Sequence, residues 1–415
     1  MRNILYISYD GLTDALGQSQ ILSYLKRLAG MGNKIVILSF EKQALFQKEG
    51  DTIKKIIDAH GLIWHPLMYT KTPPVLSTIY DVNKGLRISK DLHNQYHFDI
   101  VHCRGYISAI IGRNLQKKYG LKFIFDMRGW WPDEKLESGF WSSFMYQPVY
   151  RYFKRLERNF FYYCDFAVSL TYKGKEEIQK QRLADAGKIG VIPTCVDFDI
   201  FKHSTPEFRL RIRKKLGISE DEKVFVYSGS LGGNYDPQTL IDVFLSFQQI
   251  YPESFLLILS KDLISLDIRE MFTNAGITRM TIYNAAFTEV SDYLRSADIG
   301  FIYYKMSFST IGRSPTKLGE YWASGIPVIA FKGIGDMDLI LERYPGSGVL
   351  LSNDKNKWEE EIKSLVCTDA AVLRNYALDY FHIEKGVKFY QQTYELLAPE
   401  NKPANILSVK PINKN

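Results

Sequence analysis

The sequence predicts an α/β protein built from two doubly wound, Rossmann-like domains. Short apolar, β-branched runs alternate with helical patterns along the first 195 residues, and the alternation restarts at Lys223. Strands that alternate with helices in this way form a parallel sheet that is covered on both faces. The chain has 415 residues, which suits two domains of ordinary size.

The first half supplies six strand-like runs with helices between them. The helices include Ser19–Ala29 and Ile107–Lys118. The strands are expected at Ile4–Ser8, Lys34–Ser39, Ile100–His102, Lys122–Asp126, Phe166–Leu170 and Gly190–Ile192. This order predicts that the first domain spans residues 1–195.

The second half repeats the alternation in a second predicted domain, residues 196–382. Its strands are expected at Val224–Ser228, Phe255–Ser260, Met280–Ile282, Ile299–Tyr303, Val328–Ala330 and Val349–Leu351. Its helices are expected at Pro237–Gln249, Glu289–Arg295, 317–323, 355–366 and 368–378. Gly325 is placed to end helix 317–323, because glycine adopts the left-handed conformation of a helix C-terminus. Residues 398–415 are polar and contain Pro and Asn, which predicts a flexible tail.

Composition and charge indicate where the protein is located and which partners it can bind. No apolar run reaches the length of a membrane-spanning helix, and the first strand-like run is too short for the core of a signal peptide. We therefore expect a cytoplasmic protein, which can also lie peripherally on the inner face of the plasma membrane. The net charge of +7 lies in the N-terminal half, where it can attract anionic lipid or an acidic acceptor. Nucleic acid is not an expected partner, because the usual binding motifs are missing.

Metal and disulfide chemistry are not expected. The four cysteines lie far apart, with no metal-ligand spacing, and favour reduced, partly buried thiols. No Asp-x-Asp triplet lies at the end of a predicted strand. The sequence therefore predicts no metal requirement.

The stretch 309–331 carries the most specific pattern. A polar loop ends at Pro315, and a short helix then places Lys317 and Glu320 on one face. A helix N-terminus and a lysine suit phosphate, and a carboxylate suits hydroxyl groups. This stretch resembles the donor-binding element of the family 4 retaining glycosyltransferases, and Pro193–Phe201 resembles their interdomain linker. The resemblance implies a GT-B fold, in which two Rossmann-like domains face each other across a cleft and a helix at about 383–397 crosses back to the N-terminal domain.

The resemblance places a nucleotide-sugar donor on the C-terminal domain. The Gly-rich turn after the first strand of this domain can hold a diphosphate with backbone N–H groups. The resemblance implies cations in this turn and a second glutamate separated from Glu320 by seven residues, whereas this chain has Ser230 and Gly312 at two of these places. Lys261, Arg313 or Lys317 would then supply the missing charge. The predicted donor-binding residues are Gly17, Ser228, Gly229, Ser230, Lys261, Arg313, Ser314, Pro315, Thr316, Lys317 and Glu320.

The N-terminal domain is expected to bind the acceptor. The predicted acceptor-binding residues are Asp10, Gly11, Arg104, Trp130 and Glu134, and the predicted catalytic residues are Asp126, Arg128 and His102. All lie at the ends of predicted strands or in the loops that follow them, where doubly wound sheets bind ligands. Asp126 can take the proton of an acceptor hydroxyl, or it can form an ion pair with Arg128 that only orders the loop. Trp130 can stack on a sugar or belong to the core. The basic helix 148–163 can face a membrane or present a solvated surface.

Together these features predict a retaining, hexosyltransferase-like enzyme. It would move a sugar from a nucleotide diphosphate to the hydroxyl of a saccharide or lipid-linked acceptor, in bacterial-type surface polysaccharide or glycolipid synthesis. It would need no cofactor beyond the nucleotide sugar as co-substrate. Two alternatives stay open: a catalytically silent partner subunit of the same fold, and a sugar-nucleotide epimerase or hydrolase.

Overall fold

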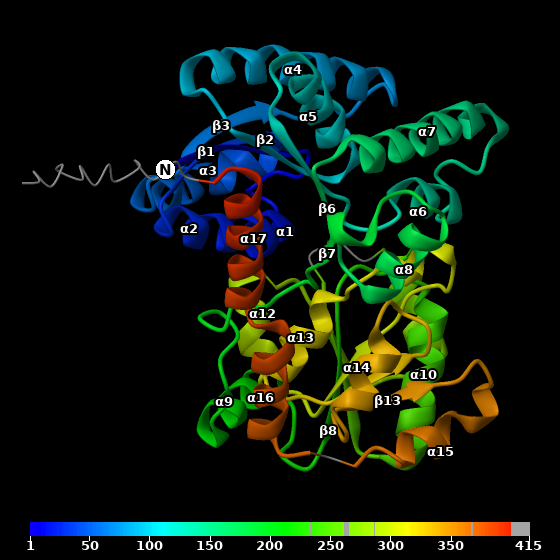
Figure 1. The fold of residues 1–415 in the computed structure, drawn as a ribbon. Helices are drawn as coiled ribbons and strands as arrows, with labels where there is room; N and C mark the ends of the chain where they lie inside the picture. Colours follow the sequence, from blue (N-terminus) through cyan, green and yellow to red (C-terminus); the bar gives the residue numbers. More distant parts are fainter. Residues whose placement is uncertain (233–234, 261–264, 286, 367, 400–415) are drawn as a thin grey trace, which may run out of the picture.

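Two parallel sheets organise the chain, and they confirm the predicted fold class (Figure 1). The computed structural model describes residues 1–399, except 233–234, 261–264, 286 and 367. The N-terminal sheet has the strand order β3-β2-β1-β4-β5-β6-β7, and the C-terminal sheet has the order β10-β9-β8-β11-β12-β13. Every pair of neighbouring strands is parallel, which is why helices must connect them.

The N-terminal sheet is buried on both faces. Its strands are β1 Arg2–Ser8, β2 Asn33–Glu41, β3 Ile63–Met68, β4 Ile100–Arg104, β5 Lys122–Asp126, β6 Phe166–Ser169 and β7 Ile189–Val191. Its helices are α1 Ala15–Gly17, η1 Gln18–Leu22, α2 Ser23–Gly30, α3 Gln43–Ala59, α4 Leu76–Tyr96, α5 Gly105–Tyr119, α6 Trp131–Glu137, η2 Phe144–Tyr146, α7 Gln147–Tyr163, α8 Tyr172–Lys180 and η3 Ala186–Lys188. Along β1, Ile4 and Tyr6 join the core on the α2 and α3 side, and Leu5 and Ile7 join the core on the α5 and α7 side.

The C-terminal domain has one large core around its sheet. Its strands are β8 Lys223–Ser228, β9 Ser254–Leu259, β10 Met280–Tyr283, β11 Ile299–Ile302, β12 Val328–Phe331 and β13 Gly348–Leu351. Its helices are α9 Pro206–Leu216, α10 Pro237–Ile250, α11 Leu266–Asn274, α12 Phe287–Leu294, η4 Phe308–Gly312, α13 Thr316–Ala323, α14 Met337–Arg343, η5 Lys355–Lys357, α15 Trp358–Lys363 and α16 Ala370–Phe381. Gly325, with φ of +79°, ends α13 as the sequence predicts.

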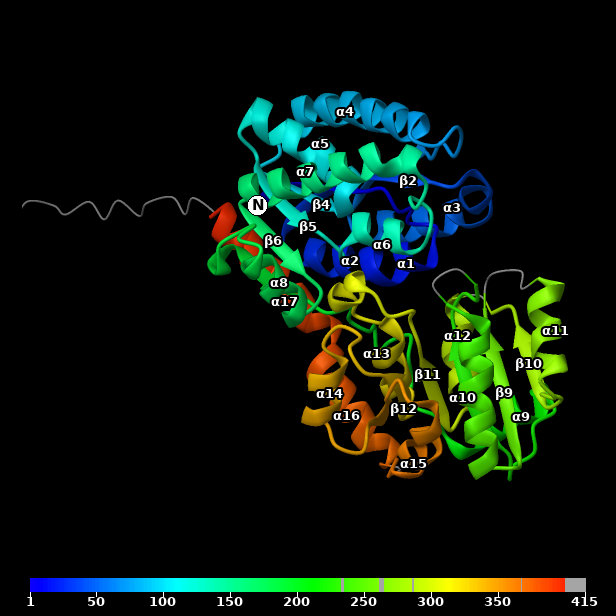
Figure 2. The ribbon, with the colours of Figure 1, turned by 90° about the vertical axis from the view of Figure 1, so that its right-hand side faces the viewer.

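The last helix returns to the N-terminal domain. Helix α17, Ile383–Leu397, follows α16 and runs up beside α2, as Figures 1 and 2 show. Its residues Val387, Tyr390 and Tyr394 are buried in the same core as Ile4 and Tyr6. The α16–α17 junction and residues 193–201 therefore connect the domains twice.

The connection at residues 193–201 is fixed to α2. Asp197 accepts hydrogen bonds from the Arg27 guanidinium at 3.0 Å and from Ser23 Oγ at 3.1 Å. Burial alone would raise the pKa of Asp197, but the hydrogen bonds and charge of Arg27 outweigh it and hold the pKa below its usual range.

Candidate active site

The carboxyl ends of β1, β4 and β5 bring most of the predicted N-terminal site residues together. The strand register pairs Ser8 with Arg104 and Arg104 with Asp126, so these residues lie side by side at one edge of the sheet. This edge is where parallel α/β sheets bind ligands.

Asp126 is held as a buried carboxylate. Its Oδ2 atom accepts a hydrogen bond from Tyr390 of α17 at 3.1 Å, and Arg128 Nη1 and His102 Nε2 each lie 3.8 Å from it. Burial would raise the pKa of Asp126, but the charge of Arg128 and the proximity of His102 and Arg104 lower it overall. A carboxylate with a lowered pKa is a weak proton acceptor and a strong source of negative charge. Its Oδ1 atom is buried without a hydrogen-bond partner among the described residues.

His102 is tied to the returning helix. Its Nδ1 atom lies 2.8 Å from the Tyr394 hydroxyl, and its ring packs against Tyr6 and Tyr390. Burial lowers the pKa of His102, so the ring is neutral near pH 7. The two tyrosines are part of this site, but they lie nearly 300 residues further along the chain, and no motif points to them.

The loop after β1 is held in shape by Glu41. This buried carboxylate accepts hydrogen bonds from Leu12 N at 2.8 Å and from Thr13 Oγ1 at 2.6 Å. A Cβ atom at Gly17 would lie 1.9 Å from the Gly11 carbonyl oxygen, so both glycines serve the tight turn of the backbone. Asp10, more than half exposed, reaches Arg104 at 3.5 Å. Glu41 is another residue that sequence reasoning missed.

Lys317 is the cation of the C-terminal site. Its Nζ atom lies against the turn after β8, 2.7 Å from where a Cβ of Gly229 would be. Three tyrosine rings surround it: Tyr227 at 4.2 Å, Tyr235 at 5.2 Å and Tyr304 at 6.0 Å from the ring centroids. The amine is buried and has no hydrogen-bond partner among the described residues. Burial lowers the pKa of Lys317 to about 7.

The other predicted donor residues gather around the same turn or at the domain interface. Ser228 donates its N–H to the Tyr321 hydroxyl, and the Ser230 carbonyl accepts from Tyr227. Glu320 lies one helical turn beyond Lys317, and burial raises its pKa to about 7 against the lowering effect of the Lys317 charge. Pro315 caps α13 and Thr316 begins it. Lys261 lies outside the described residues.

Two predicted residues, one from each domain, pair across the interface. Arg313 Nη2 lies 3.0 Å from Glu134 Oε1, so a residue assigned to the donor meets one assigned to the acceptor. Thr194 Oγ1 donates to the Ser314 carbonyl at 2.7 Å, and Ser309 N donates to Glu137 at 3.1 Å. Ser314 is thus engaged by the domain connection.

Trp130 fills the space beside Gly312. The indole is 1% exposed and packs on Phe308, with the ring centroids 5.3 Å apart. A Cβ at position 312 would lie 2.8 Å from Trp130 Cδ1, so this backbone leaves no room for a side chain at this position. The interpretation of Trp130 as a stacking surface for an acceptor is wrong, because the ring is enclosed between the domains.

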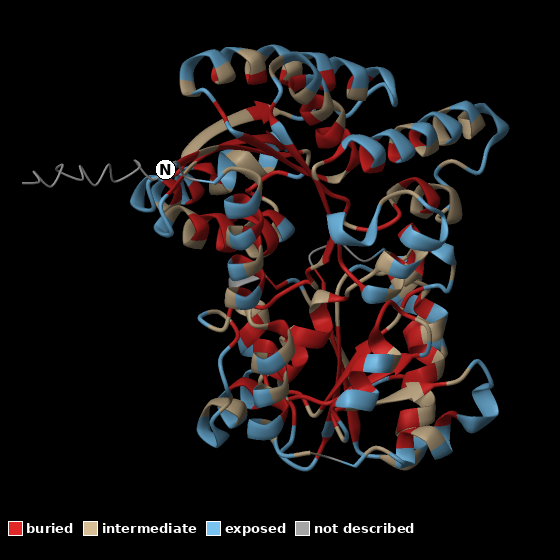
Figure 3. Cartoon of the chain, in the orientation of Figure 1, coloured by how far each residue is buried: buried red, intermediate tan, exposed pale blue. Residues whose placement is uncertain are grey.

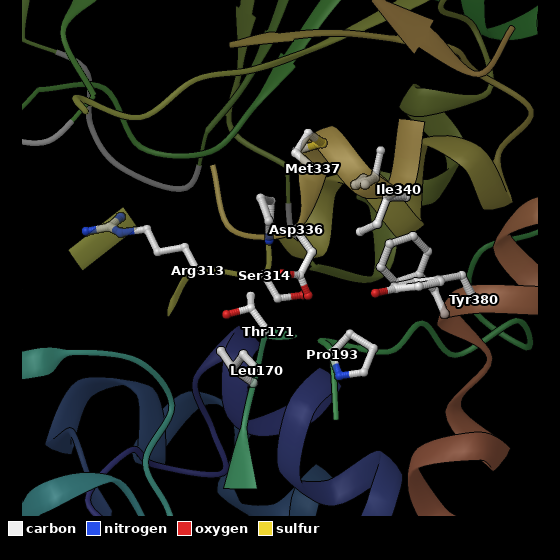
Figure 4. A pocket seen from close by; sticks show the side chains of 12 residues that line it. Leu170, Thr171, Pro193, Arg313, Ser314, Asp336, Met337, Ile340 and Tyr380 are labelled. Carbon is white, nitrogen blue, oxygen red and sulfur yellow. The ribbon is translucent and has the colours of Figure 1, made fainter. Parts of the chain in front are cut away.

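A small cavity of about 10 Å³ lies between the domains next to this site. Figure 4 shows Leu170, Thr171 and Pro193 on one side and Asp336, Met337 and Ile340 on the other, with Arg313 directed away. Asp336 accepts hydrogen bonds from the backbone N–H groups of Tyr172 at 2.6 Å and Lys173 at 3.0 Å, at the start of α8. The cavity has room for about one water molecule, so it belongs to the contact between domains.

The described residues hold neither a candidate metal site nor a candidate membrane-spanning helix. Among them, no group of three or more His, Cys, Asp or Glu side chains could hold a metal ion. None of the helices in this part of the chain is both long and apolar enough to cross a bilayer.

Two sequence comparisons relate this chain to known glycosyltransferases. Residues 17–200 match the family model of Glycosyltransferase Family 4. A D-inositol 3-phosphate glycosyltransferase of Arthrobacter sp. (strain FB24) is 24% identical over 286 residues, which is 66% of this chain. The chain spans 63% of the length of that relative.

Solved structures share the fold over nearly the whole chain. Sucrose-phosphate synthase from Thermosynechococcus elongatus is similar with a TM-score of 0.69 and 16% identity, covering 96% of this chain and 99% of its own. The Anabaena protein HepE, in complex with UDP and glucose, has a TM-score of 0.69 and 12% identity, covering 95% and 100%.

Proposed function

Because residues 17–200 match the family model of Glycosyltransferase Family 4, we propose that this chain is a glycosyltransferase that retains the anomeric configuration of a sugar that it takes from a nucleotide diphosphate. The acceptor is a hydroxyl group bound by the N-terminal domain. The C-terminal domain binds the donor, and the domains close over both substrates.

The observation that carries the proposal is the environment of Lys317. A buried amine without a hydrogen-bond partner is costly, and an anion that replaces the lost water recovers the cost. Lys317 lies over Gly229, in a Gly-rich turn that precedes a helix, where backbone N–H groups suit a diphosphate. Glu320 on the same helix face suits the hydroxyl groups of a ribose. Solved neighbours that bind UDP and UDP-glucose agree with a donor of this kind.

The departing diphosphate needs positive charge, and this chain can supply it without a metal ion. Lys317 is one source, and Arg313 is a second once it leaves Glu134. Asp126 lies on the opposite side of the interface, where its negative charge can stabilise the positive charge that develops at the transferred sugar. We assign Asp126 to this role or to positioning the acceptor hydroxyl, with Arg128 and His102 fixing its place.

A surface polysaccharide or glycolipid precursor at the membrane is the acceptor we favour. Arg151, Arg155 and Arg158 are exposed on α7, and Figure 3 shows that one side of this helix is buried while the rest faces outward. Phe140 and Phe144, just before α7, are 70% and 89% exposed. Basic and apolar side chains together suit an anionic lipid surface. Lys154 does not belong to this face, because it pairs with Asp133 and Glu157.

A thermal-shift screen with UDP, GDP, ADP and TDP sugars, with and without EDTA, tests the donor proposal. We expect stabilisation by one nucleotide class that EDTA leaves unchanged. The Lys317→Ala, Glu320→Ala double variant should lose the shift, whereas Lys305→Ala, at an exposed position nearby, should keep it. If a product forms, NMR of its anomeric proton decides between retention and inversion.

The double variant tests the silent-subunit alternative, and an assay without acceptor tests the epimerase or hydrolase. A silent partner subunit would keep its biological activity in the double variant. An epimerase would bring the nucleotide sugar to an equilibrium mixture of epimers, and a hydrolase would release the free sugar to water, both without any acceptor hydroxyl. The match to a transferase family favours the transferase over the epimerase or hydrolase.

A further inference from the structure

Two arginines at the N-terminal half of the site have more hydrogen-bond donors than the protein satisfies. Arg104 is 6% exposed, and its Nε and Nη1 atoms have no hydrogen-bond partner among the described residues. Arg128 Nε is also buried without a hydrogen-bond partner among the described residues. Buried guanidinium N–H groups are almost always paired, so these groups indicate a ligand that brings acceptors.

The charges that face Arg104 do not use up these donors. Asp10 lies 3.5 Å from Arg104 Nε without forming a hydrogen bond, and its side chain is 58% exposed. Asp126 is already engaged by Tyr390, with Arg128 nearby. Tyr6 and Tyr390 also lie close to Arg104, and both are uncharged near pH 7 because burial raises the pKa of each.

The backbone beside Arg104 adds further donors. Helix α5, Gly105–Tyr119, begins directly after it, and no side chain caps the first turn of this helix. Gly105 has φ of +77°, and apart from its two chain neighbours and the backbone of α5, no atom of the described residues lies within 4 Å of where its Cβ would be. The uncapped N–H groups of a helix of this length attract an anion.

We propose that Arg104, assisted by Arg128 and the first turn of α5, binds an oxyanion carried by the acceptor. The inference rests on the proposed transferase function and adds the substrate class: an acceptor with a phosphate or carboxylate close to the hydroxyl that receives the sugar. The orphaned Oδ1 of Asp126, on the neighbouring strand, takes that hydroxyl, while the arginines take the oxyanion. A neutral acceptor would leave the arginine donors unpaired and would bind poorly.

The test is a calorimetric titration of inorganic phosphate at constant ionic strength, with UDP present to occupy the donor side. The proteins are the wild type, Arg104→Met, Arg104→Lys and the control Arg87→Met, which lies exposed on α4. We expect Arg104→Met to weaken phosphate binding by about tenfold or more, as loss of charge-assisted hydrogen bonds predicts. Arg104→Lys should fall between, and Arg87→Met should match the wild type.

Two further arms identify the source of the oxyanion. Glucose 6-phosphate against glucose reports a soluble phosphorylated acceptor, and phosphatidic acid against phosphatidylcholine vesicles reports a lipid headgroup. Dependence on Arg104 in either arm supports the proposal. Phosphate that fails to bind the wild type, or that binds Arg104→Met equally well in a protein with unchanged melting temperature, overturns it. If Arg104→Met does not fold, the Arg104→Lys result decides alone.

The two proposals fail in different ways. Arg104-dependent phosphate binding in a protein that shows no response to any nucleotide sugar would refute the transferase and leave the anion site standing. Nucleotide-sugar turnover together with phosphate binding that does not depend on Arg104 would support the transferase and refute the anion site.

Discussion

Replacing Lys317 by methionine should stabilise the nucleotide-free protein and remove its response to nucleotide. Methionine is flexible and apolar and packs well against aromatic rings. It can occupy the space between Tyr227, Tyr235 and Tyr304 without burying a charge. The variant therefore removes an unfavourable buried charge and, at the same time, the proposed contact with the nucleotide. Such a trade of stability against function is common at active sites.

The magnitude follows from the lysine pKa, which falls from 10.5 to about 7 on folding. At about 1.4 kcal/mol per pKa unit, the charged amine costs the folded state at most about 5 kcal/mol below pH 7. Between pH 7 and 10.5 the unfolded chain holds this proton and the folded protein does not, so wild-type stability rises with pH in that window. The advantage of Lys317→Met should thus be about 2 kcal/mol or more at pH 6.5 and should shrink towards pH 10.

Urea unfolding followed by circular dichroism at pH 6.5, 8 and 9.5 measures this difference. Lys305→Met is the control, because it removes an exposed lysine close by in the chain and should show no such pH dependence. UDP or the nucleotide found in the screen should raise the melting temperature of the wild type and of Lys305→Met only. A Lys317→Met protein that is less stable than the wild type at pH 6.5 would refute the reasoning.

Three further predictions concern packing, the interdomain connection and metal. Gly312→Ala should lower the free energy of unfolding by about 1–3 kcal/mol, because its Cβ meets Trp130, and the same substitution should cost less in a Trp130→Ala background; wild-type stability in urea would contradict the clash. Asp197 has a lowered pKa, so its contribution to stability is present above pH 4 and is lost as the solution becomes more acidic. Asp197→Asn should cost about 1–3 kcal/mol at pH 7 and less at pH 3 in the same unfolding assay; an equal cost at both would count against the Arg27 pair. EDTA should leave donor binding and turnover unchanged, and activity restored only by added Mg²⁺ or Mn²⁺ would show a metal requirement.

The alternation of strands and helices was readable from the sequence, because each strand of a parallel sheet is a continuous apolar run. Where a strand lacks that pattern, the prediction missed it. Strand β3 contains His65 and Pro66, and it is formed because it lies at the sheet edge, where a proline is tolerated.

The placing of Lys317 and Glu320 on one helix was also readable, because the two residues are close in sequence. Lys317 and Glu320 lie one helical turn apart, and the helix places them on one face whatever the rest of the chain does. What Lys317 reaches was not readable. Its contact with Gly229 and the three tyrosines joins segments up to 90 residues apart.

The sequence by itself determined two parallel-sheet domains, the helix with Lys317 and Glu320, and the strand ends that carry Arg104 and Asp126. These depend on local periodicity and on the rule that parallel strands present their carboxyl ends at one edge. Only the tertiary structure decided that Tyr390 and Tyr394 of α17 hold Asp126 and His102, that Arg313 pairs with Glu134, and that Trp130 leaves no room for a side chain at Gly312. These contacts depend on how the two domains pack together, and packing between distant segments leaves no periodic mark in the sequence.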